Sequence, residues 1–331
     1  MNTTTWQNKF DLLWLPISLL IIFSSTTPVF AQTVSDAAPE AFPDVRSGNQ
    51  YYVGIKYLHD QNLVNGYPDG LFRPTSLIKR AEALKVLGSA VKFHLFDTQE
   101  RPLGSLQATP EIETIACPFP DLDKQAWYYS YICDAFHNQV VSGYPDGNFK
   151  PEQTINKVEA LKMSILQSGL STNIEFNDNF NDLTPLDWFW DYGRLANKNN
   201  FFVEDKSGNI NPSQTMNRGD FSLLIYRILR SIQNNSEFGR ATYYGGRFNG
   251  QGTANGETFS TYDLTAAHKT LPFDTIVKVT NLANGKSVTV RINDRGPYVN
   301  GAIIDLSTVA FTQIASQSTG VINVEVEIVN P

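Results

Sequence analysis

Residues 66–70 read Gly-Tyr-Pro-Asp-Gly, and residues 143–147 repeat the same five residues. Ahead of them, residues 42–45 read Phe-Pro-Asp-Val, and residues 119–122 read Phe-Pro-Asp-Leu at the same offset. A motif pair that recurs in one order at one offset indicates an internal duplication. The Pro-Asp-Gly sequence inside each copy is typical of a tight turn.

A further motif extends the duplication and shows a third copy. Arg-Ala-Glu-Ala-Leu-Lys at 80–85 returns as Lys-Val-Glu-Ala-Leu-Lys at 157–162. A degenerate third copy contains Phe-Asn-Asp-Leu at 180–183 and Asn-Arg-Gly-Asp at 217–220. Its middle, residues 203–208, has lost the Gly-Tyr-Pro-Asp-Gly pattern.

Each copy is predicted to be a helix, a turn and a second helix. Ile55, Leu58 and Leu63 have helical spacing before the first turn, and Thr75 or Ser76 can cap the helix after it. One such unit cannot bury its apolar face alone, so three are expected to pack together. The expected segments are repeat 1 (42–92), an insertion (93–118), repeat 2 (119–170) and repeat 3 (180–230).

The first residues indicate export. Residues 12–23 are apolar but shorter than the roughly 20 residues of a spanning helix, and Ala31 ends a small-residue cleavage pattern. We expect a signal peptide over residues 1–31; the alternative is an uncleaved membrane anchor. In an oxidising compartment the only two cysteines, Cys117 and Cys133, are expected to form a disulfide, with buried free thiols as the alternative.

The repeats resemble S-layer homology repeats over residues 42–230. The resemblance implies a three-repeat helical module that binds cell-wall polysaccharide in the grooves between repeats. Cationic side chains at the recurrent basic position suit anionic sugar substituents, and aromatic side chains suit sugar rings. The candidate wall-binding residues are Arg80, Lys157, Arg218, Tyr67, Tyr144 and Trp127. For each residue the alternative is a bracing or core role.

The sequence changes character after a polar stretch at 231–238, which is predicted to be a linker. Residues 275–282 and 286–293 flank Asn284-Gly285, a hairpin signal. In the last strand Ile322, Val324, Val326 and Ile328 are predicted to point inward, and Asn323, Glu325 and Glu327 outward. One short helix, capped by Ser307, should lie between the hairpin and this last strand. The 239–331 segment is therefore predicted to be a small closed barrel.

Two carboxylates stand out in this segment. Asp294 has the same strand parity as Val288, Val290 and Ile292, which predicts that it leaves the strand on the apolar side. Partial burial there would raise its pKa, as a general acid at a glycosidic oxygen requires. Glu257 supplies a second carboxylate, as glycoside cleavage commonly requires.

Residues 239–329 resemble the rare lipoprotein A family in five motifs. They are Gly-Arg-Ala-Thr-Tyr-Tyr-Gly at 239–245, Thr-Ala-Asn-Gly-Glu at 253–257, Ala-Ala-His-Lys-Thr-Leu-Pro-Phe at 266–273, Val-Arg-Ile-Asn-Asp-Arg-Gly-Pro at 290–297 and Ile-Asp-Leu-Ser at 304–307. The resemblance implies a six-stranded double-psi β-barrel, similar to family-45 endoglucanase and expansin barrels, and a septal lytic transglycosylase activity. Its functional positions fall on Glu257, His268 and Asp294 here.

The resulting expectation is a multidomain protein, a helical repeat module followed by an all-β barrel. Asp294 is expected to be the acid/base, Glu257 to stabilise charge or position substrate, and His268 to hydrogen-bond one of them, with Asp305 as the reserve acid. Asp294 could instead form only a turn, Asp305 only a helix start, and His268 only a structural hydrogen bond.

The expected partners are peptidoglycan glycan strands and cell-wall polysaccharide, in the periplasm or cell wall. The net charge of −7, without a basic stripe, argues against nucleic acid, and there is no phosphate-binding glycine loop for a nucleotide. No metal site or cofactor is predicted. The alternative function is a non-catalytic, expansin-like wall-binding or scaffolding protein.

Overall fold

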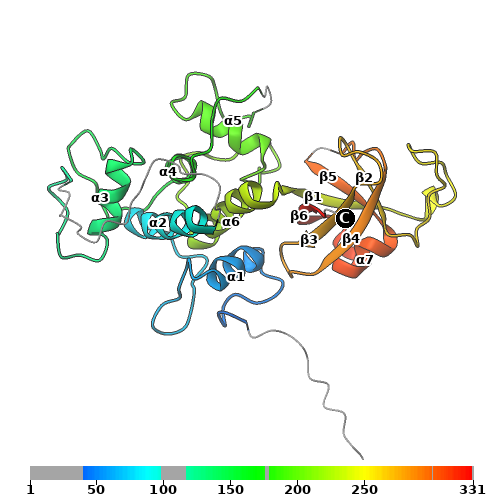
Figure 1. The fold of residues 1–331 in the computed structure, drawn as a ribbon, viewed down its shortest axis with the longest axis horizontal. Coiled ribbons are helices and arrows are strands. Elements are labelled where there is room, and N and C mark those ends of the chain that lie inside the picture. The colour runs from blue at the N-terminus through cyan, green and yellow to red at the C-terminus, as the bar shows by residue number, and fades with distance from the viewer. Residues whose placement is uncertain (1–39, 98–116, 176–178, 300, 330–331) are drawn as a thin grey trace, which may run out of the picture. The chain divides into compact units, whose positions relative to one another are not determined.

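The structure is a computed structural model that describes residues 40–97, 117–175, 179–299 and 301–329. The expected signal peptide and most of the expected insertion lie outside these residues. Figure 1 shows helices α1–α6 first in the chain, followed by a barrel of strands β1–β6 with helix α7. No helix of the described residues is both long and apolar enough to cross a membrane.

Each of the three repeats contains two helices. They are α1 (Tyr52–Asp60) and α2 (Arg80–Asp97), α3 (Tyr129–His137) and α4 (Lys157–Ser168), and α5 (Trp190–Lys198) and α6 (Arg218–Asn234). The degenerate third copy therefore keeps the helix pair. The first helix is shorter than the apolar pattern suggests, since residues 61–64 already turn away. Helix α2 begins at Arg80, later than a cap at Thr75 or Ser76 would allow, because residues 74–79 hydrogen-bond to neighbouring repeats.

The aspartate of the Phe-x-Asp motif holds the turn of its own repeat. Asp44 accepts hydrogen bonds from the backbone N–H groups of Phe72 and Arg73, at 2.9 and 2.7 Å. Asp121 and Asp182 make the corresponding pairs of bonds in repeats 2 and 3. The third repeat has thus lost the Gly-Tyr-Pro-Asp-Gly residues but keeps the bonds that shape the turn.

The recurrent basic residues join the repeats into a closed ring. Arg80 of repeat 1 donates to the carbonyl of Phe149 in repeat 2. Lys157 of repeat 2 donates to the carbonyl of Ile210 in repeat 3. Arg218 of repeat 3 donates to the carbonyl of Phe72 in repeat 1. The buried side chains of the three repeats form one continuous apolar core, as expected for units that cannot each bury a face alone.

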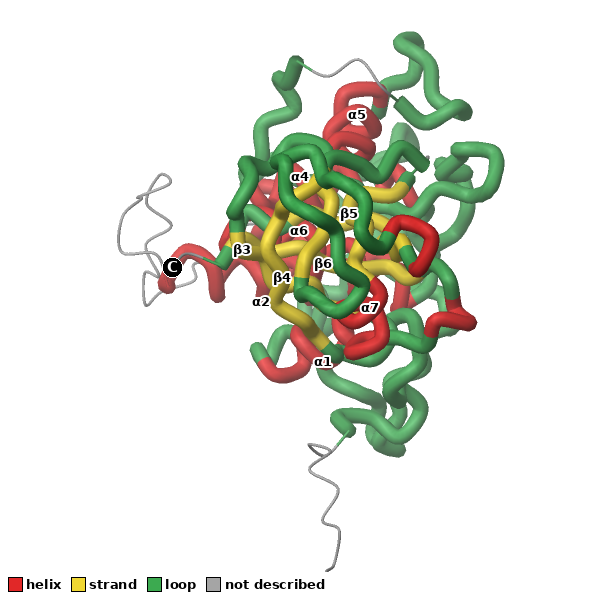
Figure 2. Tube along the Cα trace, turned by 90° about the vertical axis from the view of Figure 1, so that its right-hand side faces the viewer, coloured by secondary structure: helices red, strands yellow, loops and turns green. Residues whose placement is uncertain are grey.

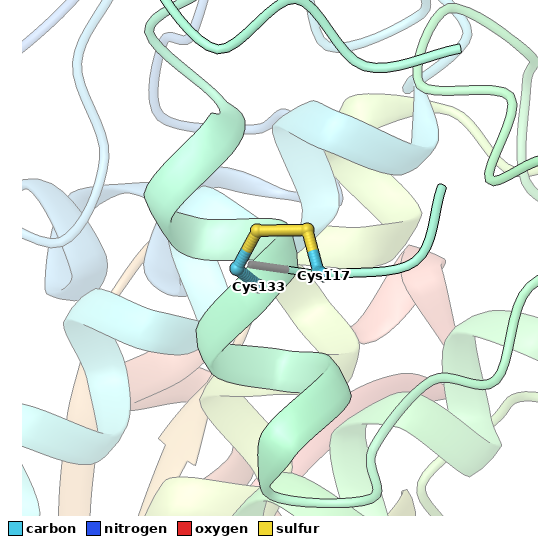
Figure 3. Close-up of a disulfide and its surroundings, with 2 residues drawn as sticks. All are labelled: Cys117 and Cys133. Atoms are coloured by element: carbon cyan, nitrogen blue, oxygen red, sulfur yellow. A yellow bond between two sulfur atoms is a disulfide. The ribbon is translucent and has the colours of Figure 1, made fainter. Parts of the chain in front are cut away.

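Cys117 and Cys133 are joined by a disulfide (Figure 3). Cys133 lies on α3, and Cys117 is the first described residue after the gap at 98–116. The bridge therefore attaches the chain that leaves the insertion to the first helix of repeat 2.

Strands β1 (Glu237–Tyr244), β2 (Thr265–His268), β3 (Ile276–Asn281), β4 (Ser287–Asp294), β5 (Ala302–Ser307) and β6 (Ile322–Ile328) close a six-stranded double-psi β-barrel. The strands follow the order β1-β5-β2-β4-β3-β6 around it, and β1–β5 and β2–β4 are parallel pairs. The predicted hairpin is β3 and β4. The predicted helix is α7 (Thr308–Ile314), capped by the hydroxyl of Ser307. In Figure 2, α7 lies beside the yellow strands.

The predicted linker at 231–238 is wrong as a description of the local structure. Helix α6 continues to Asn234 and β1 begins at Glu237, so only two residues connect them. The polar side chains in this stretch have partners on the barrel. Asn234 hydrogen-bonds to Glu327, and Ser236 donates to Glu325 at 2.8 Å. A polar composition here reflects a hydrogen-bonded interface instead of a solvated connection.

The outward orientation predicted for Glu325 does not leave it in solvent, because α6 covers it. The Glu325 side chain is only 4% exposed. It accepts hydrogen bonds from Tyr226 at 2.5 Å and from Arg230 at 2.7 Å. At the end of the same strand Ile328, which was predicted to point inward, is 38% exposed.

Candidate functional site

Four side chains form one row across the barrel wall. In the register of the strands, Ala267 on β2 pairs with Asp294 on β4 and with Asp305 on β5. Asp305 pairs in turn with Thr242 on β1. Directly paired residues of neighbouring strands place their side chains on the same face of a sheet. Asp294 and Asp305 therefore lie on one face, separated by a single strand that presents only the small Ala267.

This face is the outer one, which reverses the prediction for Asp294. Ala266 and Ile304, which directly precede Ala267 and Asp305, belong to the buried core of the barrel, as does Ile292, two residues before Asp294. On β4 the register shifts between Ala266 and Ala267, so Asn293 is an extra residue in the ladder. Such a bulge moves the following side chain to the other face of the strand. Asp294 thus leaves the strand on the side opposite to Ile292.

The two aspartates line a cleft of about 560 Å³. Its walls come from the end of β1 and the loops that follow β1 and β4. Tyr298, on the rim, is 87% exposed. The lining residues that bear on the chemistry are Thr242, Tyr244, Asp294, Arg295, Tyr298 and Asp305.

Asp305 has the environment of a proton donor. Its Oδ1 atom is shielded from solvent and has no hydrogen-bond partner among the described residues. Burial is the main cause that raises the pKa of Asp305 to about 6, and the negative charge of Asp294 raises it further, while Thr242 opposes the shift. A carboxyl group with a pKa of about 6 is protonated for roughly a tenth of the time at pH 7, far more often than an ordinary aspartate.

Asp294 is held by the surrounding backbone. Its Oδ1 atom accepts hydrogen bonds from the N–H groups of Ala254 and Arg295, at 2.9 and 2.8 Å. The Arg295 guanidinium lies over the ring of Phe273, 3.7 Å from the centroid. The loop at 254–257 is thereby fixed next to the cleft.

Glu257 forms an ion pair with Arg291 and does not line the cleft. Both of its carboxylate oxygens accept from Arg291, at 2.9 and 2.8 Å, and one accepts from Asn293 at 3.0 Å. The hydrogen bond to Arg291 is the main cause that lowers the pKa of Glu257 to about 2. Glu257 therefore remains ionised, which suits the predicted anionic role and excludes proton donation at neutral pH.

His268 hydrogen-bonds neither Asp294 nor Glu257, contrary to the prediction. The ring is buried, and Nδ1 accepts from the backbone N–H groups of Thr270 and Leu271. Nε2 lies 3.2 Å from a carboxylate oxygen of Glu237. With Nδ1 as an acceptor, the proton of a neutral ring is on Nε2 and is donated to Glu237. His268 therefore braces the start of β1 and the loop after β2.

Two cleft residues were not singled out from the sequence, although both lie in the motif at 239–245. The hydroxyls of Thr242 and Tyr244 are buried and have no hydrogen-bond partner among the described residues. Burial is the main cause that raises the pKa of Tyr244. The sequence could have identified both residues, because they are polar and two positions apart on β1, which places their side chains on the same face of the strand.

The predicted wall-binding cations brace the helical repeats. Arg80 is 6% exposed and lies over the rings of Tyr144 and Phe149, at 4.6 Å from each centroid. Arg218 lies over Tyr67 and Phe72 in the same way. Tyr67 and Tyr144 are each contacted by a second cation, Arg73 and Lys150 respectively. Lys157 is half-buried, and burial is the main cause that lowers its pKa.

Two exposed tryptophans recur beside lysines from the preceding repeat. Lys85 lies 5.5 Å from the ring centroid of Trp127, and Lys162 lies 5.2 Å from that of Trp188. The two rings are 52% and 59% exposed. Trp127, Lys85, Tyr67 and Arg218 line a common groove of about 210 Å³. Trp188 was not among the candidates, although it occupies in the degenerate third copy the position that Trp127 occupies in the second.

The third equivalent groove is closed by the barrel. Leu223 and Gln50 have the positions of the lysine and the tryptophan there. The remaining cavity, about 120 Å³, is lined in part by Leu282 and Asn323 of the barrel. Within the described residues, no group of three or more His, Cys, Asp or Glu side chains is placed to hold a metal ion.

Comparison with known families agrees with both parts of the molecule. Residues 236–326 match the family model described as lytic transglycolase, and residues 41–84 and 118–161 match the S-layer homology domain. The chain combines S-layer homology domains with a lytic transglycolase domain. Repeat 3 adds a helix pair of the same kind to the two S-layer homology domains that the family model matches.

Curated relatives resemble the transglycolase domain. The endolytic peptidoglycan transglycosylase RlpA of Vibrio cholerae is 43% identical over 129 residues, which cover 38% of this chain and 49% of the relative. The probable endolytic peptidoglycan transglycosylase RlpA of Synechocystis is 59% identical over 91 residues, 28% of each chain. The chain thus spans half or less of the length of these relatives. The crystal structure of a Clavibacter michiganensis expansin is similar to 29% of this chain and 50% of its own, with 21% identity and a TM-score of 0.25.

Proposed function

We propose that the transglycolase domain cleaves peptidoglycan glycan strands and leaves 1,6-anhydromuramyl ends, while the S-layer homology domains hold the protein at the cell wall. The observation that carries the first part is the pair of aspartates on one row of the barrel face. One carboxyl, of Asp305, is partly buried with a raised pKa, and the other, of Asp294, is fixed by two backbone hydrogen bonds. The curated relatives named as peptidoglycan transglycosylases support the choice of substrate.

The proposed reaction begins with protonated Asp305. It donates its proton to the glycosidic oxygen as the bond from that oxygen to the muramyl anomeric carbon breaks. The Asp305 carboxylate then accepts the proton of the muramyl C6 hydroxyl while the C6 oxygen bonds to the anomeric carbon. The proton returns to Asp305, no water is consumed, and the carboxyl cycles between the two forms that a pKa of about 6 makes accessible.

The sequence assigned the acid/base role to Asp294, and we now assign it to Asp305. Asp294 takes the role of the second carboxylate, which stabilises positive charge that develops on the sugar ring. Its carboxylate is close enough to Asp305 to influence the titration of that group. We assign to Glu257 the role of positioning the loop at 254–257, through its bonds to Arg291 and Asn293. The N–H group of Ala254, in the same loop, donates a hydrogen bond to Asp294.

The test is digestion of purified peptidoglycan with the full chain, followed by mass spectrometry of the released sugars. Products with 1,6-anhydro ends are expected. Products with reducing ends would make the protein a hydrolase and overturn the intramolecular step. Wild-type protein that binds wall material but releases no sugar, from intact and from peptide-stripped glycan, would favour an expansin-like function without cleavage.

For the wall-anchoring part, we assign binding to the groove lined by Trp127 and Lys85 and to the equivalent surface at Trp188 and Lys162. The exposed rings of Trp127 and Trp188 offer flat apolar faces for sugars. The adjacent Lys85 and Lys162 offer positive charge to anionic substituents. Arg218, which joins repeats 3 and 1, also lines the groove that holds Trp127.

A further inference from the structure

A second cleft lies between repeat 3 and the barrel, away from the carboxylate pair. It has a volume of about 530 Å³ and is mostly polar. Its walls include the altered turn of repeat 3, the start of β1 and Gly301, which precedes β5. Four asparagines, Asn179, Asn181, Asn197 and Asn200, line it on the repeat side. Asn179 has no hydrogen-bond partner for its amide among the described residues.

A buried arginine that forms no ion pair within the described residues lines this cleft. Arg227, on α6, is 2% exposed. One terminal nitrogen donates to the carbonyls of Asn200 and Phe201, at 2.8 and 3.4 Å. Within the described residues its Nε has no hydrogen-bond partner, and Asp220 acts on the guanidinium electrostatically without forming an ion pair. A buried guanidinium without an anion is costly, so its retention points to an anion that is supplied from outside.

This arginine is a feature of repeat 3 alone. Ser89 and Leu166 have the corresponding positions in repeats 1 and 2. The same repeat has lost the Gly-Tyr-Pro-Asp-Gly turn, and residues 203–206 of the replacement turn line the cleft. The repeat whose groove is closed by the barrel has therefore acquired a different polar surface next to the barrel.

The barrel contributes a second cation. Arg240 on β1 lines the cleft and lies against Gly301, whose φ of +69° and missing side chain make room for it. Arg240 and Thr242 are two residues apart on β1, so their side chains share a face about 7 Å apart along the strand. Thr242 lines the active cleft. One continuous face of β1 thus joins the two clefts.

We propose that the cleft between repeat 3 and the barrel binds carboxylate groups of the glycan strand whose next sugars occupy the active cleft. The inference rests on the proposed function. Arginine forks recognise carboxylates, and side-chain amides match sugar hydroxyls and N-acetyl groups. The carboxylate is either that of the lactyl group on the muramyl ring or one on the peptide attached to it.

The experiment measures binding of the full chain, made inactive by Asp305→Asn, to defined glycan chains several disaccharides long. Arg227→Met and Arg240→Met should each weaken binding about tenfold, the effect of losing one charge-assisted hydrogen bond. Arg46→Met, an exposed arginine near the start of repeat 1, is the matched control and should bind as the parent does. Arg227→Met should also resist urea at least as well as the parent, because it removes an uncompensated buried charge.

Three glycan preparations separate the possible carboxylates. The experiment compares peptide-free chains with intact lactyl groups, the same chains esterified at the lactyl carboxylate, and chains that keep their peptides. Loss of affinity on esterification assigns the lactyl group, and a need for the peptide assigns a peptide carboxylate. Equal affinity for all three, or arginine variants that bind as the control does, would overturn the inference. Since wild-type cleavage is measured separately, that result would leave the proposed function standing.

Discussion

Among single residues, the protonation state of Asp305 decides the proposed chemistry. Asp305→Asn keeps the size of the side chain but cannot transfer a proton, so release of anhydro products should fall by about 10²- to 10⁴-fold. Asp294→Asn should also lower the rate, through lost charge stabilisation. Asp274→Asn is a suitable control, since Asp274 is exposed and pairs with Arg291 outside the cleft. If Asp294→Asn abolished cleavage while Asp305→Asn did not, the original assignment to Asp294 would be right.

The pH dependence follows from the raised pKa of Asp305. Because the donor must be protonated, kcat/KM should fall as pH rises through about 6. The folded-state pKa lies above that of an unfolded aspartate, so the folded state holds more protons between about pH 4 and 6. The free energy of unfolding should therefore decrease with pH across this window. Denaturant titrations of wild type and Asp305→Asn check this, and an equal pH dependence in both would contradict it.

At the scale of elements, α6 and β6 are joined through a buried polar network. Arg230 donates to Glu325 and, at 3.0 Å, to Glu327, while Tyr226 donates to Glu325. Arg230→Met should lower the free energy of unfolding by about 3 kcal/mol, since it leaves the buried Glu325 without its counter-ion. Urea unfolding measures this. The double variant Arg230→Met/Glu325→Met should recover part of the loss, and a double variant as unstable as the sum of both singles would show that the charges are not coupled.

The disulfide acts on the first helix of repeat 2. It closes a loop with a sequence separation of 16, which by chain-entropy reasoning stabilises the folded state by on the order of 3 kcal/mol. Reduction, or a Cys117→Ala/Cys133→Ala variant, should lower the melting temperature of the helical repeats. Mass mapping of the purified protein without reductant should find the bridged peptides. Two freely alkylatable thiols there would contradict the bridge.

For the whole molecule, two exposed tryptophan–lysine pairs predict bivalent attachment to the wall. Trp127→Ala and Trp188→Ala should each weaken binding to isolated sacculi, and the double variant should weaken it far more, because the second contact in a bivalent complex is intramolecular. Cleavage of short soluble glycans should continue, since neither ring lines the active cleft. Sedimentation with sacculi measures binding. Equal binding by wild type and the double variant would place the anchor elsewhere.

Much of the local structure follows from the sequence alone. The duplicated motifs predict the helix pairs, because the same aspartate and turn recur at the same offset. The Asn284-Gly285 turn predicts the β3–β4 hairpin, and Ser307 predicts the start of α7. These features depend on residues close in sequence, whose hydrogen bonds and side-chain periodicity are set by local geometry.

Burial of the polar residues was decided by tertiary structure. Strand parity placed Asp294 on the apolar side, but the bulge at Asn293 turns it outward. Alternation predicted that Glu325 points outward from the barrel, but Tyr226, 99 residues earlier, covers it. Burial between the neighbouring strands β1 and β2 is the main cause that raises the pKa of Asp305, and the charge of Asp294 on β4 raises it further. The pattern of a strand identifies its two faces, whereas the segments that pack on each face determine which charges remain in water.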